Sequence, residues 1–165
     1  MHLLDTDIVF ELRNARSGGT DAGLARWAAG VPRASLFLSV ITLMELEADI
    51  LRVERKDKAA GLALRHWLDG QVVPAFEGRI LSVDASVARR VAHLPQGGGR
   101  DAVLAATALE HGLTLVTRNV AAFKAARVRV FNPWGYTPEA VSDDEDWGQA
   151  AKAGSQWLRN IFVRG

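Results

Sequence analysis

Four oxygen-bearing side chains stand where short apolar runs end or where helices are expected to begin. Asp5 follows a short apolar strand, Glu45 and Asp101 lie near the openings of two helical patterns, and Asn119 closes a polar triplet after a further strand. Carboxylate and amide oxygens are hard ligands that suit Mg²⁺ or Mn²⁺. Three or four of them together could hold one or two ions against a phosphodiester, where a metal ion activates water and screens the attacking and leaving oxygens.

The stretch 100–119 is expected to position two of these groups. Asp101 stands at an N-cap position before apolar residues at helical spacing, and Gly112 stands at the C′ position that ends the helix. Residues 113–116 are rich in β-formers and predict a buried strand. The triplet 117–119 then falls at the carboxyl end of that strand, which is where sites form in open α/β sheets.

Each acid also has a purely structural interpretation. Asp5 fits the N-cap of the helix expected after the first strand. Thr42 and Glu45 fit a capping box, in which the glutamate side chain reaches back to the backbone amide of the threonine. Asp84 is interpreted as a plain cap of the helix that follows it. Because acidic helix caps are common, the spacing alone leaves both interpretations open for Asp5 and Glu45.

Short apolar strands alternate with helical patterns along the chain, which predicts an α/β fold with a parallel-rich sheet flanked by helices. Strands are expected at 2–5, 35–41, 79–83, 113–116 and 128–131, helices at 8–13, 20–29, 42–55, 59–68, 85–94 and 101–110, a short helical turn at 120–126, and an irregular link at 72–76.

Composition bounds the class of protein. The chain has 165 residues, a net charge of +1 and no cysteine, which excludes disulfides and thiolate metal sites. No apolar run approaches the roughly 20 residues that cross a bilayer, and no secretory signal is visible, so we expect a cytoplasmic protein without membrane contact. We expect one domain over 1–134, and an acidic linker with a C-terminal helical tail over 135–165.

Four segments in this order resemble the motifs of PIN-domain ribonucleases of the VapC and FitB kind. They are the opening segment 2–13, the second acidic motif at 39–46, the third and fourth motifs at 101–119, and the ending Asn132–Pro133–Trp134. The resemblance covers residues 1–134 and implies a PIN-like fold.

The resemblance also implies a function. It implies a metal-dependent endoribonuclease that uses Mg²⁺ or Mn²⁺ and is the toxin of a bacterial type II toxin–antitoxin pair. The substrate would be structured RNA such as tRNA or rRNA, and the partners would be a cognate antitoxin and a second copy in a homodimer. It places metal-ligand roles on Asp5, Glu45 and Asp101, and a catalytic role as a neutral oxygen on Asn119.

Supporting residues and departures follow from the same resemblance. Thr6 and Thr117 would support ligands or phosphate, and Asp7, where the family often has asparagine, would supply a supporting hydrogen bond. Ala122 stands where the family commonly has an acid, which puts a second metal ion in question. The tail beyond residue 134 is a further departure.

Basic side chains near the motifs could bind RNA phosphates. The alternative interpretation is that they are ordinary surface charges. The candidate RNA-binding residues are Arg13, Arg100, Arg118 and Lys124.

Two rival functions remain open. The segment 5–9 also fits the start of haloacid dehalogenase-type phosphatases, with Asp5 as nucleophile and Asp7 as acid/base, but that leaves Glu45 and Asp101 unexplained. A PIN module that binds RNA or a partner without cutting is the other, and it is motivated by Ala122. In the tail, Trp147, Trp157 and Phe162 are expected to contact an antitoxin groove or a dimer interface, or simply to dock a helix on the domain.

Overall fold

The computed structural model describes residues 1–17, 19–95 and 97–138, and the predicted helical tail lies outside them. Five strands form one sheet in the order β3-β2-β1-β4-β5, and every adjacent pair is parallel. This confirms the predicted parallel α/β sheet. The strands are β1 (His2–Leu4), β2 (Leu36–Ser39), β3 (Ile80–Leu81), β4 (Thr114–Val116) and β5 (Val130–Phe131).

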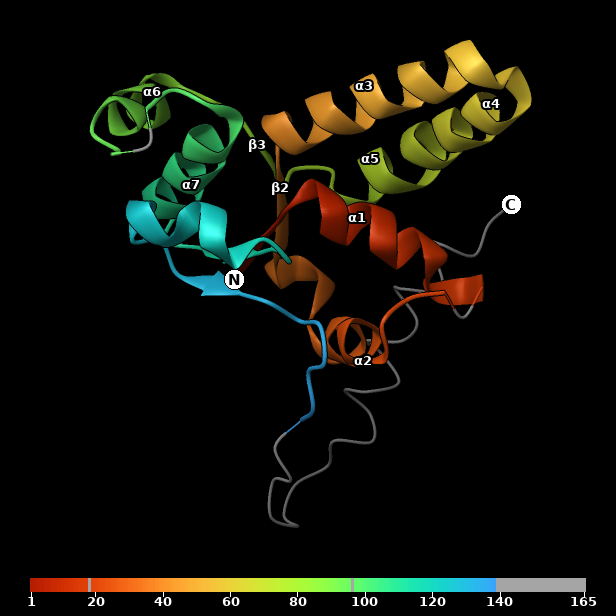
Figure 1. The fold of residues 1–165 in the computed structure, drawn as a ribbon, viewed down its shortest axis with the longest axis horizontal. Coiled ribbons are helices and arrows are strands. Elements are labelled where there is room, and N and C mark those ends of the chain that lie inside the picture. Colours follow the sequence, from red (N-terminus) through yellow and green to blue (C-terminus); the bar gives the residue numbers. More distant parts are fainter. Residues whose placement is uncertain (18, 96, 139–165) are drawn as a thin grey trace.

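Helices connect and cover these strands (Figure 1). The α-helices are α1 (Thr6–Arg13), α2 (Ala22–Gly30), α3 (Val40–Lys56), α4 (Lys58–Trp67), α5 (Val73–Ala75), α6 (Ala85–Ala92) and α7 (Arg100–Glu110). Shorter helical segments span Asn14–Ser17, Arg33–Ser35, Leu68–Val72 and Val120–Ala126. The irregular link predicted at 72–76 is wrong, because a π-helical turn carries α4 directly into α5 and buries Leu68 and Val72.

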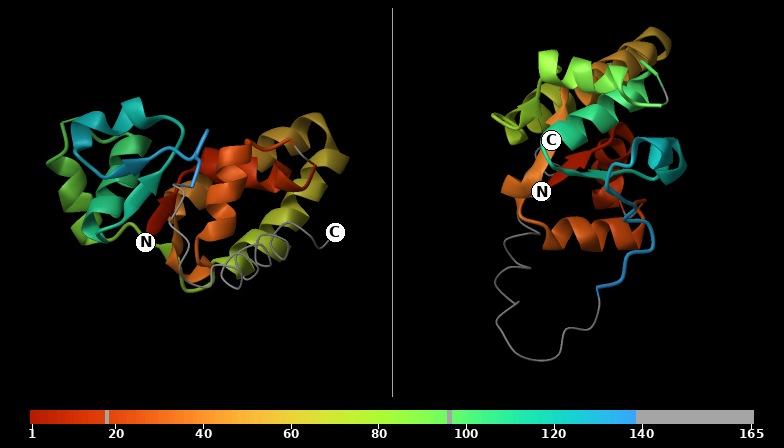
Figure 2. Two further views of the ribbon diagram at one scale, coloured as in Figure 1. Left: turned by 90° about the horizontal axis from the view of Figure 1, so that it is seen from below. Right: turned by 90° about the vertical axis from the view of Figure 1, so that its left-hand side faces the viewer.

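The sheet has a separate apolar core on each face. Successive residues of a strand point to opposite faces, and accordingly Leu3 packs in one core while Leu4 packs in the other. One core lies under α1, α2, α3 and α4, and the other lies under α7 and the Val120–Ala126 segment. Figures 1 and 2 show the α3–α4 hairpin on one side of the molecule and α6 with α7 on the other. Because both faces are covered, the strands consist mostly of apolar residues.

The strand order places a crevice at the carboxyl edge of the sheet. The chain moves from β1 to β2 in one direction and continues later at β4, on the opposite side of β1. The strand order therefore reverses between β1 and β4, and ligands in open α/β sheets bind at such a point. Asp5 follows β1 and Thr117 follows β4.

Two of the helix starts that differ from the prediction bear on the acidic side chains. α3 begins at Val40, where the Ser39 hydroxyl accepts the N–H of Ile41. Thr42 is already helical and its hydroxyl donates to the carbonyl of Leu4 at 3.2 Å, so the predicted Thr42–Glu45 capping box is wrong. The acidic side chain of Glu45 is therefore not a cap.

α7 begins one residue earlier than predicted. Gly99 occupies the N-cap position without a side-chain bond, and Asp101 lies in the first turn, so the predicted Asp101 cap is wrong. The predicted end of this helix is confirmed. Gly112 has φ +63°, its N–H donates to the Leu109 carbonyl and the Leu113 N–H donates to the Ala108 carbonyl, which is a Schellman closure.

The cap roles of Asp5 and Asp84 are confirmed. Asp5 accepts the N–H of Thr6 at 2.8 Å and Asp84 accepts the N–H of Val87 at 2.9 Å. Among the helices of the described ranges, none has the length and apolar character needed to cross a bilayer.

Candidate metal centre

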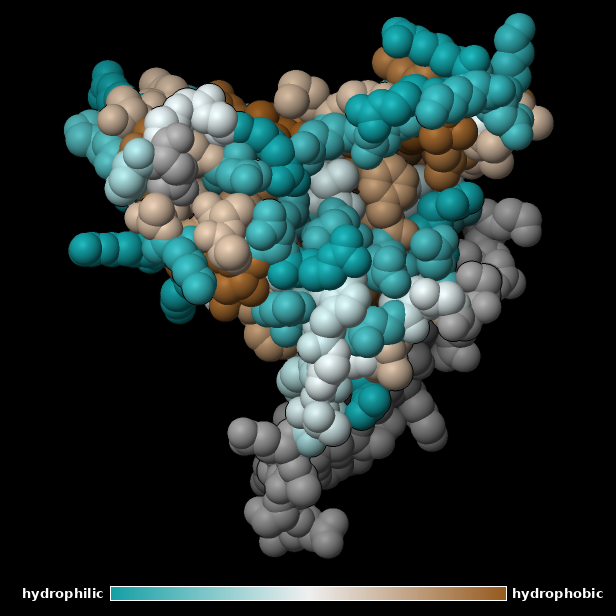
Figure 3. All heavy atoms as spheres, in the orientation of Figure 1, coloured by the Kyte–Doolittle hydropathy of each residue, from teal (hydrophilic) through white to brown (hydrophobic). Residues whose placement is uncertain are grey.

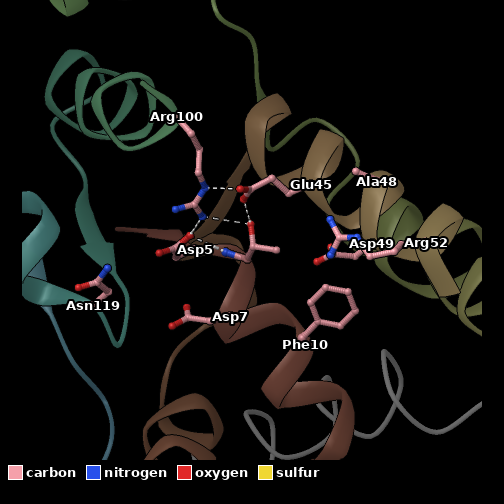
Figure 4. Close-up of a pocket in the computed structure, with 10 residues that line it drawn as sticks. Asp5, Asp7, Phe10, Glu45, Ala48, Asp49, Arg52, Arg100 and Asn119 are labelled. Atoms are coloured by element: carbon pink, nitrogen blue, oxygen red, sulfur yellow. Dashed lines mark hydrogen bonds and ion pairs between the residues drawn. The ribbon is translucent and has the colours of Figure 1, made fainter. Parts of the chain in front are cut away.

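The carboxylates of Asp5, Glu45 and Asp101 converge on one guanidinium, that of Arg100. Figure 4 shows this guanidinium between Asp5 and Glu45. Nη1 of Arg100 lies 2.5 Å from Oδ1 of Asp101, Nη2 contacts Oδ1 of Asp5, and Nε approaches Oε1 of Glu45. The residues come from the end of β1, the second turn of α3 and the first turn of α7. The structure therefore brings together three acids that are up to 96 positions apart in sequence.

Asp5 is the most firmly fixed of the three. Its side chain is buried, Oδ1 accepts the Thr6 N–H, and Oδ2 accepts the Thr117 hydroxyl at 2.7 Å. Thr117 is itself buried, and its hydroxyl accepts the N–H of Asn119 at 3.1 Å. Asp5 is therefore both a helix cap and a member of the acidic cluster, so the two interpretations of this residue are compatible.

Glu45 is oriented by a hydroxyl from another helix. The Thr6 side chain on α1 donates to Oε2 of Glu45, and Nη2 of Arg100 donates to the same threonine oxygen at 3.4 Å. Because α3 begins at Val40, Glu45 lies one turn inside the helix and points across to α1 rather than back along its own helix.

Asp7 lies beside the cluster without joining it. Its Oδ2 accepts the N–H of Arg118 at 3.2 Å, whereas its Oδ1 is buried with no hydrogen-bond partner. Burial, and next the negative charge of Asp5, raise the pKa of the Asp7 carboxyl above its usual value. Hydrogen bonding therefore compensates the negative charge of the Asp7 carboxylate only in part.

Replacing this charge by a neutral amide should stabilise the protein. Asp7→Asn keeps an oxygen for the Arg118 N–H, and we expect Tm to rise at neutral pH by about 2–4 °C, the shift that about 1 kcal/mol produces in a domain of this size. A raised pKa favours folding while the carboxyl is protonated, and this contribution is lost as the pH rises through the raised value. The gain should therefore vanish in acid, below the usual aspartate pKa.

Thermal unfolding of the metal-free protein across pH measures this effect. Asp21→Asn is the matched control, because backbone N–H donors, first that of Gly135 and then that of Leu24, lower the pKa of Asp21. This control should lose stability at neutral pH. A fall in Tm for Asp7→Asn at neutral pH would contradict the charge argument.

A pocket of about 440 Å³ opens beside the cluster. Hydrophilic side chains gather over this part of the surface, between α7 and α1 (Figure 3). Its lining consists of Asp5, Thr6, Asp7, Phe10, Glu45, Ala48, Asp49, Arg52, Arg100 and Asn119.

The sequence analysis did not identify four of these lining residues as part of the site. Phe10 is one turn after Thr6 on α1, and Ala48, Asp49 and Arg52 follow Glu45 by three, four and seven positions on α3. Residues at these spacings share one helix face. The signal was therefore present, and extending each motif along its own helix would have found them.

The predicted RNA-binding residues lie in different surroundings. Arg118 is exposed and stacks its guanidinium over the Trp134 ring at 5.3 Å, and Arg13 lies over the Trp67 ring at 5.6 Å. Lys124 is exposed on the Val120–Ala126 segment. Arg100 differs from these three because its nitrogens face the acidic cluster.

The acidic cluster fits a hard divalent cation by ligand type and charge. Three carboxylates and one guanidinium leave a surplus of two negative charges. Burial lowers the pKa of Arg100, but the contact with the Glu45 carboxylate and the charge of Asp5 outweigh it and raise that pKa above its usual value. In the conformation described for residues 1–17, 19–95 and 97–138, no three acidic or histidine side chains are close enough together to hold an ion. The Arg100 cation instead stands at their meeting point.

The fold and this cluster define an α/β domain with an acidic pocket at the switch point of a parallel sheet. The chain belongs to the PIN-domain family, whose family model matches residues 2–128.

Similar proteins span most of the chain. The VapC ribonuclease Y4jK of Sinorhizobium fredii is 31% identical over 142 residues, which cover 81% of this chain and 98% of that protein. Toxin FitB of Neisseria gonorrhoeae is 34% identical over 143 residues, which cover 81% and 99%. Among solved structures, that of FitAcB from Neisseria gonorrhoeae aligns with a TM-score of 0.73 at 31% identity, covering 81% of this chain and 99% of that one.

Proposed function

We propose that this protein is a metal-dependent endoribonuclease that acts as the toxin of a bacterial type II toxin–antitoxin pair. The convergence of Asp5, Glu45 and Asp101 from three separate elements carries the proposal. The names of the similar proteins, a VapC ribonuclease and a toxin, support it. Family membership, and the grouping of Glu45 and Asp101 with Asp5, favour a nuclease over a phosphatase that would use Asp5 and Asp7 alone.

The side chains of the site would have two kinds of role, metal binding and the orientation of the ligands. Asp5, Glu45 and Asp101 would hold Mg²⁺ or Mn²⁺, which when bound supplies water activation and charge screening at the phosphodiester. Thr117 and Thr6 keep the carboxylates of Asp5 and Glu45 oriented through their hydroxyl donors. Such outer hydrogen bonds fix ligand geometry in metal sites.

The substrate would be a structured RNA such as tRNA or rRNA. Asn119 lines the pocket and would offer a neutral polar group to the substrate or the ion. Arg118 and Lys124 are exposed on the segment that follows β4, and Arg13 ends α1. Their positive charges would bind the RNA backbone around the pocket.

The partners would be a cognate antitoxin and a second copy of the chain. Among the solved structures similar to this chain, one is a toxin–antitoxin complex from Klebsiella pneumoniae, with a TM-score of 0.54 at 25% identity, covering 81% of this chain and 98% of that one. Co-purification with the product of an adjacent small gene, and light scattering of the free protein, test these two partners separately.

Cleavage of RNA by the purified protein tests the proposed activity. We expect Mn²⁺ or Mg²⁺ to restore cleavage after chelation, and Asp101→Asn to lower the rate by at least about 100-fold. Removing a residue that only hydrogen-bonds to a metal ligand already lowers metal affinity or activity by about 10–100-fold. Removing a direct ligand should therefore lower the activity by at least the upper value. A protein that binds RNA but leaves it intact with either ion would instead be the non-cutting module that Ala122 suggests.

A further inference from the structure

The guanidinium of Arg100 makes more contacts with the acidic cluster than any ordinary surface arginine would. Nη1 contacts Asp101, Nη2 contacts both Asp5 and Thr6, and Nε faces Glu45. The side chain is about one-third exposed, and the Nε atom is buried without hydrogen-bond geometry to any acceptor. The contact of Nε with Glu45 is therefore ionic rather than a hydrogen bond.

The position of Arg100 reduces the electrostatic repulsion among the carboxylates of Asp5, Glu45 and Asp101. The three carboxylates gathered around the Arg100 guanidinium repel one another, and the positive charge between them reduces that repulsion. Arg100 supplies the cation from within the chain, because it directly precedes Asp101 in the first turn of α7. Figure 4 shows its side chain extending from α7 to a place between Asp5 and Glu45.

The same contacts oppose a divalent ion. Both oxygens of Asp5 are already engaged, since Oδ1 accepts the Thr6 N–H and binds the guanidinium and Oδ2 accepts the Thr117 hydroxyl. Oδ1 of Asp101 also binds the guanidinium, so an ion that takes these carboxylates as ligands has to displace Arg100 from them. A positive guanidinium at this place also repels an incoming cation. The two occupants therefore compete for one set of oxygens.

We propose that Arg100 is a built-in counter-ion that holds the metal-free cluster together and has to withdraw from it when a divalent ion binds. The inference rests on the proposed function, because it takes Asp5, Glu45 and Asp101 as the metal ligands. Arg100 thereby sets the ion concentration at which the site fills. The long arginine side chain can withdraw by rotation about its own bonds while α7 stays in place.

Mn²⁺ titration without RNA tests this role. We expect Arg100→Gln to bind Mn²⁺ at least about tenfold more tightly than wild type by calorimetry, which corresponds to about 1.4 kcal/mol. Without metal the variant should melt below wild type, and it should gain more in Tm on adding Mn²⁺. Arg100→Lys keeps the charge but loses the planar fork, so its affinity should be intermediate, and it serves as the test if Arg100→Gln does not fold.

Arg52→Gln is the matched control. Arg52 lines the same pocket and carries the same charge, but its ion pair is with Asp49 of its own helix at 2.7 Å. We expect its Mn²⁺ affinity to stay within about threefold of wild type, because an exposed pair contributes little. Equal gains in both variants would overturn the specific role of Arg100 and leave only a general charge effect.

The outcomes separate this inference from the proposed function. If wild type binds Mn²⁺ and Arg100→Gln binds it no more tightly, the inference fails while the metal site stands. If only Arg100→Gln binds Mn²⁺, the counter-ion role is supported. If neither binds, both the metal site and the inference fail.

Discussion

Asp5→Asn is expected to lower the rate of RNA cleavage by about 10³-fold, a loss of about 4 kcal/mol of transition-state stabilisation. Asp5 is the buried member of the acidic cluster, and both of its oxygens are engaged. Asparagine removes the negative charge and one acceptor, so the pocket would lose a metal ligand at its most rigid point. Single-turnover cleavage at saturating Mn²⁺ measures the effect on chemistry separately from RNA binding.

The substitution should leave the fold largely intact, because asparagine is as good an N-cap as aspartate. Asp84→Asn makes the same chemical change at the cap of α6, where the side chain accepts the Val87 N–H and lies outside the acidic cluster. That control should cleave RNA at the wild-type rate. If Asp5→Asn retained more than about a tenth of the activity, less than about 1.4 kcal/mol would depend on the charge, and Asp5 would be a cap only.

Gly23→Ala is expected to give the largest loss of stability, about 3 kcal/mol, at the upper end for overpacking. A Cβ at Gly23 would lie 2.6 Å from the Gly135 nitrogen and closer still to the Tyr136 nitrogen. These are backbone atoms, so the segment after β5 would have to move off α2. The move would break the bond from the Gly135 N–H to Asp21 Oδ1 at 3.1 Å and the packing of Tyr136 against Phe131.

Urea unfolding with Gly30→Ala as the control measures this loss. Gly30 ends the same helix, and a Cβ there would meet no atom within 4 Å. Alanine at this position should be neutral or stabilising, since glycine is the weaker helix former by about 1 kcal/mol. Equal stabilities for the two variants would mean that the segment around Gly135 does not rest on α2.

The strands and helices were largely predictable because each has a local signal. Leu24, Trp27 and Ala28 recur at helical spacing and are all buried under the sheet. The helix starts were less predictable. Ser39 ends β2 in register with Leu81 of β3, and this pairing decides where extended backbone stops and α3 begins. The Ser39 hydroxyl also caps α3 at this point, so the strand pairing and the cap together place the helix start two residues before the predicted one.

The candidate site was predicted as a set of residues but not as an arrangement. Asp5 and Thr117 were placed correctly at the carboxyl edge because they follow adjacent parallel strands. The sequence allows Glu45 to be either a helix cap or a metal ligand, and the structure removes the cap interpretation. Arg100 was predicted to bind RNA phosphate, whereas its guanidinium lies among the three acids. Its contact with RNA stays a prediction.

The alternation of strands and helices, the parallel sheet and the gathering of polar groups at one edge of it all follow from the amino-acid sequence. These properties follow from hydrophobic periodicity and from the residues that directly succeed each strand, and both are local. Two features follow only from the packing of separate elements: Arg100 stands between Asp5 and Glu45, and the helix faces that carry Phe10 and Arg52 meet at one pocket. Hydrophobic periodicity predicts which face of a helix is buried. Which side chains of α1, α3 and α7 contact one another depends on how these helices pack around the sheet.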